Sequence, residues 1–399
     1  MRGVAIVVAL LIVIGVWLPG ETRDWGSAHL LLGVTHAQYS LDPDLAPAQR
    51  AAGERILGAT ALLQNQHIMG FGALNPEPAP GEFDWSSLDS RMDLIAHTRG
   101  TPVITLCCAP DWMKGGSPGT TDWNRLTDAP LPGHYADFAD LAATVALRYP
   151  QVRYFQVWNE LKGFWDTSAN TWDAAGYTDF YNQVYDAVKR ARPDAVIGGP
   201  YAVFTTFPSA SQAGPLSGPY GQLDERVAQF YRYWNEHKHG ADFVAVDAST
   251  ANPAANALYA DVTRWVRALT GLPVWWSEFY PGAPAGTDEA RAAATLDAVA
   301  QAATAGASAM LLWQPQASAD LPYAALWTDP SDGPIEPTSL TAAWTWLAPR
   351  LAAGSVRIAR DVPGDLLWFS DGHQTLTVNL SGSAHVGQPR LAPYAIALG

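Results

Sequence analysis

The sequence has very few cysteines, and this excludes a fold held together by disulfides. Its 399 residues contain only Cys107 and Cys108, which are neighbours in an apolar run. A disulfide framework needs several cysteines spaced along the chain. If the run is a β-strand, successive side chains face opposite ways. We therefore expect two buried, reduced thiols, with a disulfide between the neighbours or a redox role as the alternative.

Positive charge is also scarce. The chain has 24 Lys and Arg against 38 Asp and Glu, which gives a net charge of −14. No basic stretch is long enough to follow a phosphate backbone. We therefore expect no nucleic-acid partner.

Motifs for metals, phosphates and serine nucleophiles are missing as well. The nine histidines are scattered, without the His-x-x-x-His spacing or Cys and His clusters of zinc sites. The chain has no phosphate-binding loop with its lysine, and no Gly-x-Ser-x-Gly elbow. The sequence thus predicts no metal and no cofactor.

One long stretch without charge lies at the N-terminus. After Arg2, residues 3–20 contain no charged side chain. An apolar segment behind a single arginine is typical of a secretory signal, and its length is near the lower limit for a membrane span. We expect residues 1–20 to be a signal peptide or a membrane anchor, and the protein to be exported to the periplasm or the extracellular space.

Apolar or β-rich runs alternate with helical stretches through most of the chain. The runs lie near residues 30–35, 61–68, 102–108, 152–158, 195–198, 242–247, 272–276 and 307–313, and helical stretches include 135–149, 177–192, 223–237, 256–270 and 287–305. Eight strand-plus-helix units predict an α/β fold, the (β/α)8 TIM barrel. We place this barrel at 28–350. Short β-rich runs separated by turns predict a small C-terminal β domain at 351–399.

Loop lengths give the predicted barrel a direction. Connections from helix into strand are tight, whereas those leaving the strands are long, notably 110–133, 201–221 and 315–339. Long ordered loops in a compact domain usually carry function. Barrel enzymes also place their chemistry at the carboxyl ends of the strands.

Two glutamates lie at this end of the predicted barrel. Glu160 closes the aromatic-rich run 154–160, and Glu278 closes the run 272–278. A carboxylate costs several kcal/mol to desolvate unless it is paired, so two of them at strand ends indicate a polar site. Retaining glycoside hydrolysis uses two such groups about 5 to 5.5 Å apart. The alternative is a structural ion pair.

The segments around these glutamates resemble clan A glycoside hydrolases, and most of all glycoside hydrolase family 39 and its relatives. The matching segments are GEFDW at 81–85 followed by LD at 88–89, APDWM at 109–113, VWNE at 157–160, IGGP at 197–200 and WSE at 276–278. This resemblance implies a carbohydrate substrate, and 17 Trp and 15 Tyr supply flat faces on which sugar rings stack.

The resemblance implies a role for each site residue. Glu160 is the expected acid/base, kept protonated by partial burial beside Trp158, and Glu278 is the expected nucleophile. Asn159 is expected to bind the sugar 2-hydroxyl, and Trp313 to stack on a sugar ring. Further sugar contacts are expected from Trp112, Tyr280, His36, Gln66 and Asp247. For each of these, core packing or capping is the alternative.

Two positions depart from the family pattern. Relatives commonly have an arginine at the end of the second strand, where this chain offers Gln66 or His67, and a histidine at the end of the sixth, where it has Asp247.

The two glutamates and the family motifs together predict a retaining O-glycoside hydrolase that acts on a β-linked oligo- or polysaccharide. The alternatives are a transglycosylase using the same residues and a carbohydrate-binding barrel that has lost turnover.

Overall fold

The computed structural model describes residues 25–399 except 60–61, 210–211, 284–285, 362–364 and 388. The predicted signal peptide or anchor at 1–20 lies outside the described residues. Within them, no helix has both the length and the apolar character that crossing a bilayer requires.

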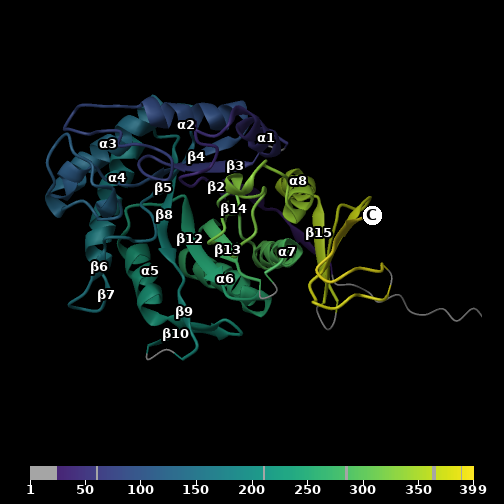
Figure 1. Cartoon of the computed structure of the whole chain (residues 1–399). Coiled ribbons are helices and arrows are strands. Elements are labelled where there is room, and N and C mark those ends of the chain that lie inside the picture. Colours follow the sequence, from purple (N-terminus) through teal and green to yellow (C-terminus); the bar gives the residue numbers. More distant parts are fainter. Residues whose placement is uncertain (1–24, 60–61, 210–211, 284–285, 362–364, 388) are drawn as a thin grey trace, which may run out of the picture.

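Eight parallel strands form a closed barrel (Figure 1). In order around it they are β2 (Leu31–Thr35), β3 (Leu63–His67), β4 (Thr101–Leu106), β5 (Tyr154–Val157), β8 (Val196–Val203), β12 (Phe243–Thr250), β13 (Val274–Pro281) and β14 (Ala309–Trp313). Each predicted run overlaps one of these strands, so the predicted TIM barrel is confirmed. β8, β12 and β13 extend past their predicted ends, and this extension shapes the site described below.

Helices surround the barrel (Figure 1). They are α1 (Pro47–Leu57), α2 (Ser86–His97), α3 (Tyr135–Arg148), α4 (Ala174–Ala191), α5 (Glu225–His237), α6 (Ala257–Thr270), α7 (Asp288–Ala305) and α8 (Ser339–Ala352). Each presents an apolar stripe to the strands; α6, for example, buries Leu258, Val262 and Val266 at helical spacing.

Small elements fill the long loops after the strands. Two hairpins lie there, β6 (Trp165–Asp166) with β7 (Thr171–Trp172), and β10 (Ala213–Gly218) with β11 (Gly221–Asp224), the second joined by β9 (Thr206–Phe207). The short 3-10 helices of the described chain are η1 (Asp111–Lys114), η2 (Trp123–Arg125), η3 (Pro132–His134), η4 (Pro253–Asn256) and η5 (Pro330–Asp332).

A polar ring crosses the inside of the barrel above its apolar floor. The Thr35 hydroxyl donates to the Ser277 carbonyl at 2.7 Å, and the Asn65 amide donates to Thr35 Oγ1 at 3.2 Å. The Thr105 hydroxyl donates to Asn65 Oδ1 at 2.8 Å and accepts from the Gln156 amide at 3.2 Å. The Ser277 hydroxyl closes the ring on Gln156. Five strands are thus tied together directly below the carboxyl ends that hold the site.

The C-terminal strands form a separate antiparallel sheet that packs beside α7 and α8 (Figure 1). Its order is β1 (Gly26–Ala28), β15 (Val356–Arg360), β16 (Leu366–Ser370), β17 (Thr375–Asn379) and β18 (Ile396–Leu398). The predicted β-rich character after 351 is confirmed. The edge strand β1 was not predicted, since it comes from the other end of the described chain and pairs with β15.

The prediction of two reduced thiols is wrong, because Cys107 and Cys108 are joined by a disulfide. The predicted strand ran through both cysteines, whereas β4 ends at Leu106. Beyond the strand the side chains no longer alternate between opposite faces, so the two sulfurs meet. Both residues are buried in the barrel core.

Candidate active site

Three carboxyl groups meet at the carboxyl end of the barrel. Glu160 lies three residues after the end of β5, Asp247 lies in β12 and Glu278 lies in β13. One oxygen from each lies within 4.8 Å of the others. The two glutamates singled out in the sequence are therefore brought together. Asp247, expected from the sequence as a sugar contact or a cap, joins them from β12, which lies between β5 and β13 in the barrel.

A bulge in β13 points Glu278 into this cluster. Trp275 packs inside the barrel and Trp276 outside, where its indole N–H is bonded to α6. Ser277 faces inward again and joins the polar ring. Strict alternation would turn Glu278 outward, but the register with β12 shifts here, so that Glu278 pairs with Asp247. Bulges redirect side chains in this way.

A second bulge on β8 supplies a partner for Glu278. The register with β12 skips Tyr201, whose neighbours Pro200 and Ala202 pair with successive residues. Tyr201 has a φ of 58° and is fully buried in the barrel. Its hydroxyl donates a hydrogen bond to Glu278 Oε1 at 2.5 Å. Two neighbouring bulges thus orient the tyrosine and the carboxylate toward each other.

A sharp turn after β5 places Glu160. Trp158, Glu160 and Leu161 have φ values of 68°, 52° and 56°, in the left-handed region. Trp158 is buried against phenylalanines of α3 and α4, and its indole N–H donates to the Lys162 carbonyl at 2.7 Å. This hydrogen bond closes the turn and leaves Glu160 at the rim, with 16% of its side chain exposed.

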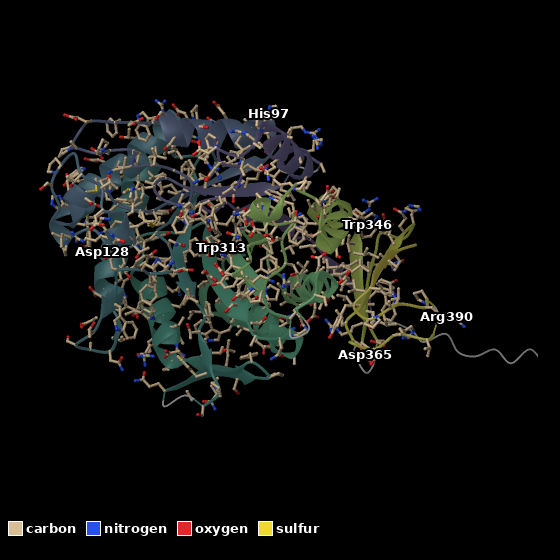
Figure 2. All side chains as sticks on the ribbon, in the orientation of Figure 1. His97, Asp128, Trp313, Trp346, Asp365 and Arg390 are labelled. Atoms are coloured by element: carbon tan, nitrogen blue, oxygen red, sulfur yellow. A yellow bond between two sulfur atoms is a disulfide. The ribbon has the colours of Figure 1, made fainter. Side chains whose placement is uncertain are left out.

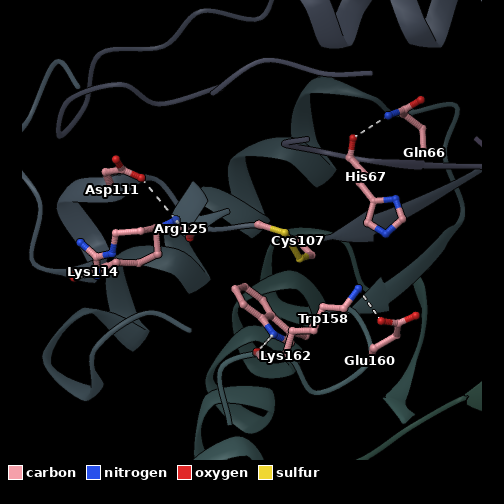
Figure 3. Close-up of a disulfide and its surroundings, with 10 residues drawn as sticks. Gln66, His67, Cys107, Asp111, Lys114, Arg125, Trp158, Glu160 and Lys162 are labelled. Carbon is pink, nitrogen blue, oxygen red and sulfur yellow. Dashed lines mark hydrogen bonds and ion pairs between the residues drawn. A yellow bond between two sulfur atoms is a disulfide. The ribbon is translucent and has the colours of Figure 1, made fainter. Parts of the chain in front are cut away.

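Lys162 forms an ion pair with Glu160 from the same turn (Figure 3). A neighbouring ammonium group favours the charged form of a carboxyl group. Burial beside Trp158 was expected to keep Glu160 protonated, and Lys162 was not expected as its partner. The turn places the positive charge of Lys162 directly beside Glu160.

Burial has the opposite effect on Glu278. Its pKa is raised to about 8, chiefly by desolvation and then by the charge of Glu160, while the Tyr201 hydroxyl and the Lys162 charge act against the rise. The pKa of Asp247 is raised well above its usual range by burial and by the two glutamates. Three carboxyl groups this close cannot all be ionised, so the cluster holds protons at neutral pH.

Two predicted sugar contacts, Asn159 and Trp313, are connected through the rings of His67 and Phe71. Asn159 is buried and its Oδ1 has no hydrogen-bond partner, while its side chain also lies next to His67. The His67 ring stacks on Phe71 at 4.1 Å, and Phe71 in turn meets Trp313 edge-on at 6.1 Å. Trp313 ends β14 near the middle of the barrel in this view (Figure 2). Burial lowers the pKa of His67 to about 3, so this histidine is neutral.

Tyr280 and Trp112 have different surroundings. Tyr280 is on β13 next to Asp247, and its ring contacts Tyr323 at 5.1 Å. Trp112 is buried, and its indole N–H is already used in a 2.9 Å bond to the Glu77 carbonyl. Tyr280 is therefore part of the cluster, whereas the contacts of Trp112 fit core packing.

His36 and Gln66 do not join the carboxyl cluster. His36 Nε2 is bonded to Gln64 at 3.0 Å, and burial lowers the pKa of this histidine to about 3. The Gln66 amide donates to two backbone carbonyls, and its Oε1 accepts from Arg91 of α2 at 2.8 Å. Of the two residues that the sequence offered at the end of the second strand, Gln66 and His67, it is His67 that lies beside Asn159.

Sequence reasoning missed two partners of the glutamates, Tyr201 and Lys162. Lys162 is two residues after Glu160, and this proximity was a usable signal. Tyr201 follows a predicted strand that was expected to end at 198, and no periodicity marks the bulge that turns it inward.

The three clustered oxygens are close enough together to share one divalent cation. Lys162 already brings a positive charge to them, and its ammonium group contacts Glu160. These oxygens therefore already have one cationic partner, the Lys162 ammonium group, among the described residues.

Replacing Tyr201 with phenylalanine tests its effect on Glu278. Loss of the hydroxyl removes a hydrogen bond that favours the ionised carboxylate, so the pKa of Glu278 should rise further. The ionised form of Glu278 is then reached only at higher pH. If catalysis uses this form, the acid limb of the kcat/KM profile of Tyr201→Phe should move to higher pH. Tyr185→Phe, on α4 beside the turn at Gly240, is the control, and an unmoved limb in Tyr201→Phe would contradict this role of the tyrosine.

Comparison with known proteins identifies the fold at low sequence identity. No known family model matches the sequence, and no curated protein matches it either. Solved structures do match. A monomeric β-xylosidase from Caulobacter crescentus is 17% identical, with a TM-score of 0.60, over 92% of this chain and 76% of that one.

Two further structures agree. A family 39 glycoside hydrolase from Xanthomonas axonopodis is 18% identical, with a TM-score of 0.61, over 92% of this chain and 74% of that one. A glucosidase from Croceicoccus marinus is 14% identical, with a TM-score of 0.58, over 92% and 81%. The structural neighbours are thus family 39 enzymes and related β-glycosidases, as the motifs suggested. At these identities the likeness shows the fold.

Proposed function

We propose that the protein is a retaining glycoside hydrolase that cleaves β-linked oligo- or polysaccharides. The observation that carries the proposal is the close approach of Glu160 and Glu278 at the carboxyl end of the barrel. A short separation between two carboxyl groups fits the retaining mechanism, because an inverting enzyme keeps about 6.5 to 9.5 Å between them for a water molecule. The xylosidase and glucosidase names among the structural neighbours support a sugar substrate.

In the first step the bond between the anomeric carbon and the leaving oxygen breaks. Glu160 gives its proton to that oxygen while the Glu278 carboxylate bonds to the anomeric carbon, which yields a covalent glycosyl-enzyme. This step needs the proton on Glu160 and the charge on Glu278. Burial raises the pKa of Glu278 and so opposes the charge that this step needs, while the Tyr201 hydroxyl and the Lys162 charge support it.

In the second step water displaces Glu278 from the anomeric carbon. Glu160, now ionised, takes a proton from the water as it attacks the anomeric carbon, and Glu278 leaves as a carboxylate. The hydrogen bond from Tyr201 stabilises that leaving charge. The polar ring includes Ser277 and so fixes the backbone next to Glu278.

The proposal is tested by product analysis. The chain from residue 21 onward is incubated with a panel of β-linked polysaccharides and aryl glycosides, and products are identified by chromatography. We expect sugar products from at least one substrate. No product from a folded protein across the whole panel, together with sugar binding, would instead support the carbohydrate-binding alternative. Products longer than the substrate would identify transglycosylation.

We also propose that the protein is exported. The uncharged segment at 3–20 motivates this proposal, and disulfides such as Cys107–Cys108 persist mainly in oxidising compartments. The full-length chain is expressed in a bacterial host, and its location and N-terminal mass are measured. A mature chain lacking about the first 20 residues would indicate a cleaved signal, and an intact chain in the membrane fraction an anchor. Retention of the intact chain in the cytosol would contradict export.

A further inference from the structure

Asp247 is a buried carboxyl group without a counter-ion. Its side chain is fully buried, and neither of its oxygens has a hydrogen bond of regular geometry. No Lys, Arg or His side chain in the described part of the chain forms an ion pair with it. The nearest ammonium group, that of Lys162, contacts Glu160 instead.

Its surroundings are acidic or neutral apart from Lys162. The titratable groups that face it come from β8, β13, α5, α6 and the turn after β5: Tyr201, Glu278, Tyr280, Tyr231, Tyr259, Glu160 and Lys162. Tyr280 and the two glutamates are the closest of these, since Asp247 interacts directly with each of them.

Charge counting then fixes the state of Asp247. The cluster contains three carboxyl groups and one ammonium group, which is already paired with Glu160. The first step of the proposed mechanism requires a negative charge on Glu278 and a proton on Glu160. A further charge on Asp247 would be desolvated, without an ion-pair partner and within 4.8 Å of the Glu278 carboxylate.

We propose that Asp247 is a neutral carboxylic acid in the working enzyme and positions the two glutamates by donating a hydrogen bond to one of them. The inference rests on the proposed function. A neutral acid has an O–H donor, which an ionised carboxylate lacks. With Tyr201 on its other side, Glu278 then has two neutral donors in place of a cationic partner. Asp247 is a positioning residue, because its full burial keeps it from the sugar.

Isosteric replacement separates a neutral Asp247 from an ionised one. Asparagine keeps the shape and an N–H donor but cannot ionise, whereas valine removes the donor. We expect kcat/KM of Asp247→Asn to stay within about tenfold of wild type at neutral pH, consistent with one altered hydrogen bond. Its acid limb, which reports ionisation of Glu278, should stay close to that of wild type, because the amide still donates a hydrogen bond in place of the neutral acid. Asp247→Val should lose much more activity.

Asp242→Asn is the control for these variants. Asp242 is ion-paired with Lys189 and lies just before β12, so its replacement should leave the pH profile unchanged. Asp247→Asn with an activity as low as Asp247→Val would show that an ionised carboxylate is required. Profiles identical to wild type in both Asp247 variants would show a merely structural role. Either result overturns the proposal.

Infrared spectroscopy gives a readout that does not depend on activity. In the Glu278→Gln background, Asp247→Asn should remove a protonated-carboxyl C=O band at neutral pH. Its persistence would overturn the proposal, even where Asp247→Val fails to fold. If the wild-type protein cleaves no glycoside, the proposed function fails, while the infrared band still reports on Asp247 alone.

Discussion

Glu278→Gln should lose nearly all glycosidase activity while remaining folded. The amide keeps the size of the side chain and can still accept the Tyr201 hydrogen bond, but it cannot form the glycosyl-enzyme. Removal of a covalent nucleophile elsewhere costs on the order of 10⁴ to 10⁶ in kcat, and we expect a loss in this range. Initial rates on an aryl glycoside measure it, with the melting temperature as the test of folding.

Glu54→Gln is the matched control for this loss. Glu54 is on α1, outside the barrel, where it forms an ion pair with Arg50. This variant should retain wild-type turnover. If Glu278→Gln also turned over at a rate near wild type, Glu278 would not be the nucleophile.

Glu160→Ala should lose activity in a way that depends on the leaving group. General acid catalysis contributes roughly 10² to 10⁴-fold, so substrates with poor leaving groups should slow by about this factor. A dinitrophenyl glycoside needs no proton to depart, and its first step should proceed. The glycosyl-enzyme then accumulates, because water has lost its base.

Azide distinguishes the two glutamates. As an anion it needs no base, so it should rescue Glu160→Ala and give a β-glycosyl azide from a β-linked substrate. In Glu278→Ala it would take the place of the nucleophile and give the α-glycosyl azide. Nuclear magnetic resonance of the products identifies the anomer. The absence of rescue in Glu160→Ala on an activated substrate would remove Glu160 from the acid/base role.

The barrel and its direction follow from the sequence because they depend on repeated patterns. Eight apolar runs, tight helix-to-strand connections and long return loops are each spread over many residues, so small local errors do not change the result. The placement of Glu160 and Glu278 toward the carboxyl end of the barrel follows from the same patterns.

The detailed contacts depend on single residues and could not be read in this way. One extra residue in β13 turns Glu278 inward, and another in β8 does the same for Tyr201. Such shifts leave no trace in a pattern of period two. Ending β4 one residue before Cys107 changes two buried thiols into a disulfide.

The electrostatics of the site required three-dimensional distances. Lys162 is visible in the sequence, but its contact with Glu160 depends on the left-handed turn that Trp158 anchors. Asp247 lies 31 residues before Glu278 in the chain, and only the pairing of β12 with β13 makes them neighbours. The sequence offered Gln66 or His67 at the end of the second strand, and only the structure shows that His67 lies beside Asn159 while Gln66 is bonded to Arg91 of α2.

Trapping the covalent intermediate tests the central claim most directly. The protein is incubated with a 2-deoxy-2-fluoro-β-glycoside that has an activated leaving group, chosen for the sugar found in the product screen, and digested for mass spectrometry. A single fluoroglycosyl group on Glu278 is the predicted result. Labelling of a different carboxyl group, or turnover of the natural substrate with inversion and no trapped species, would contradict the account.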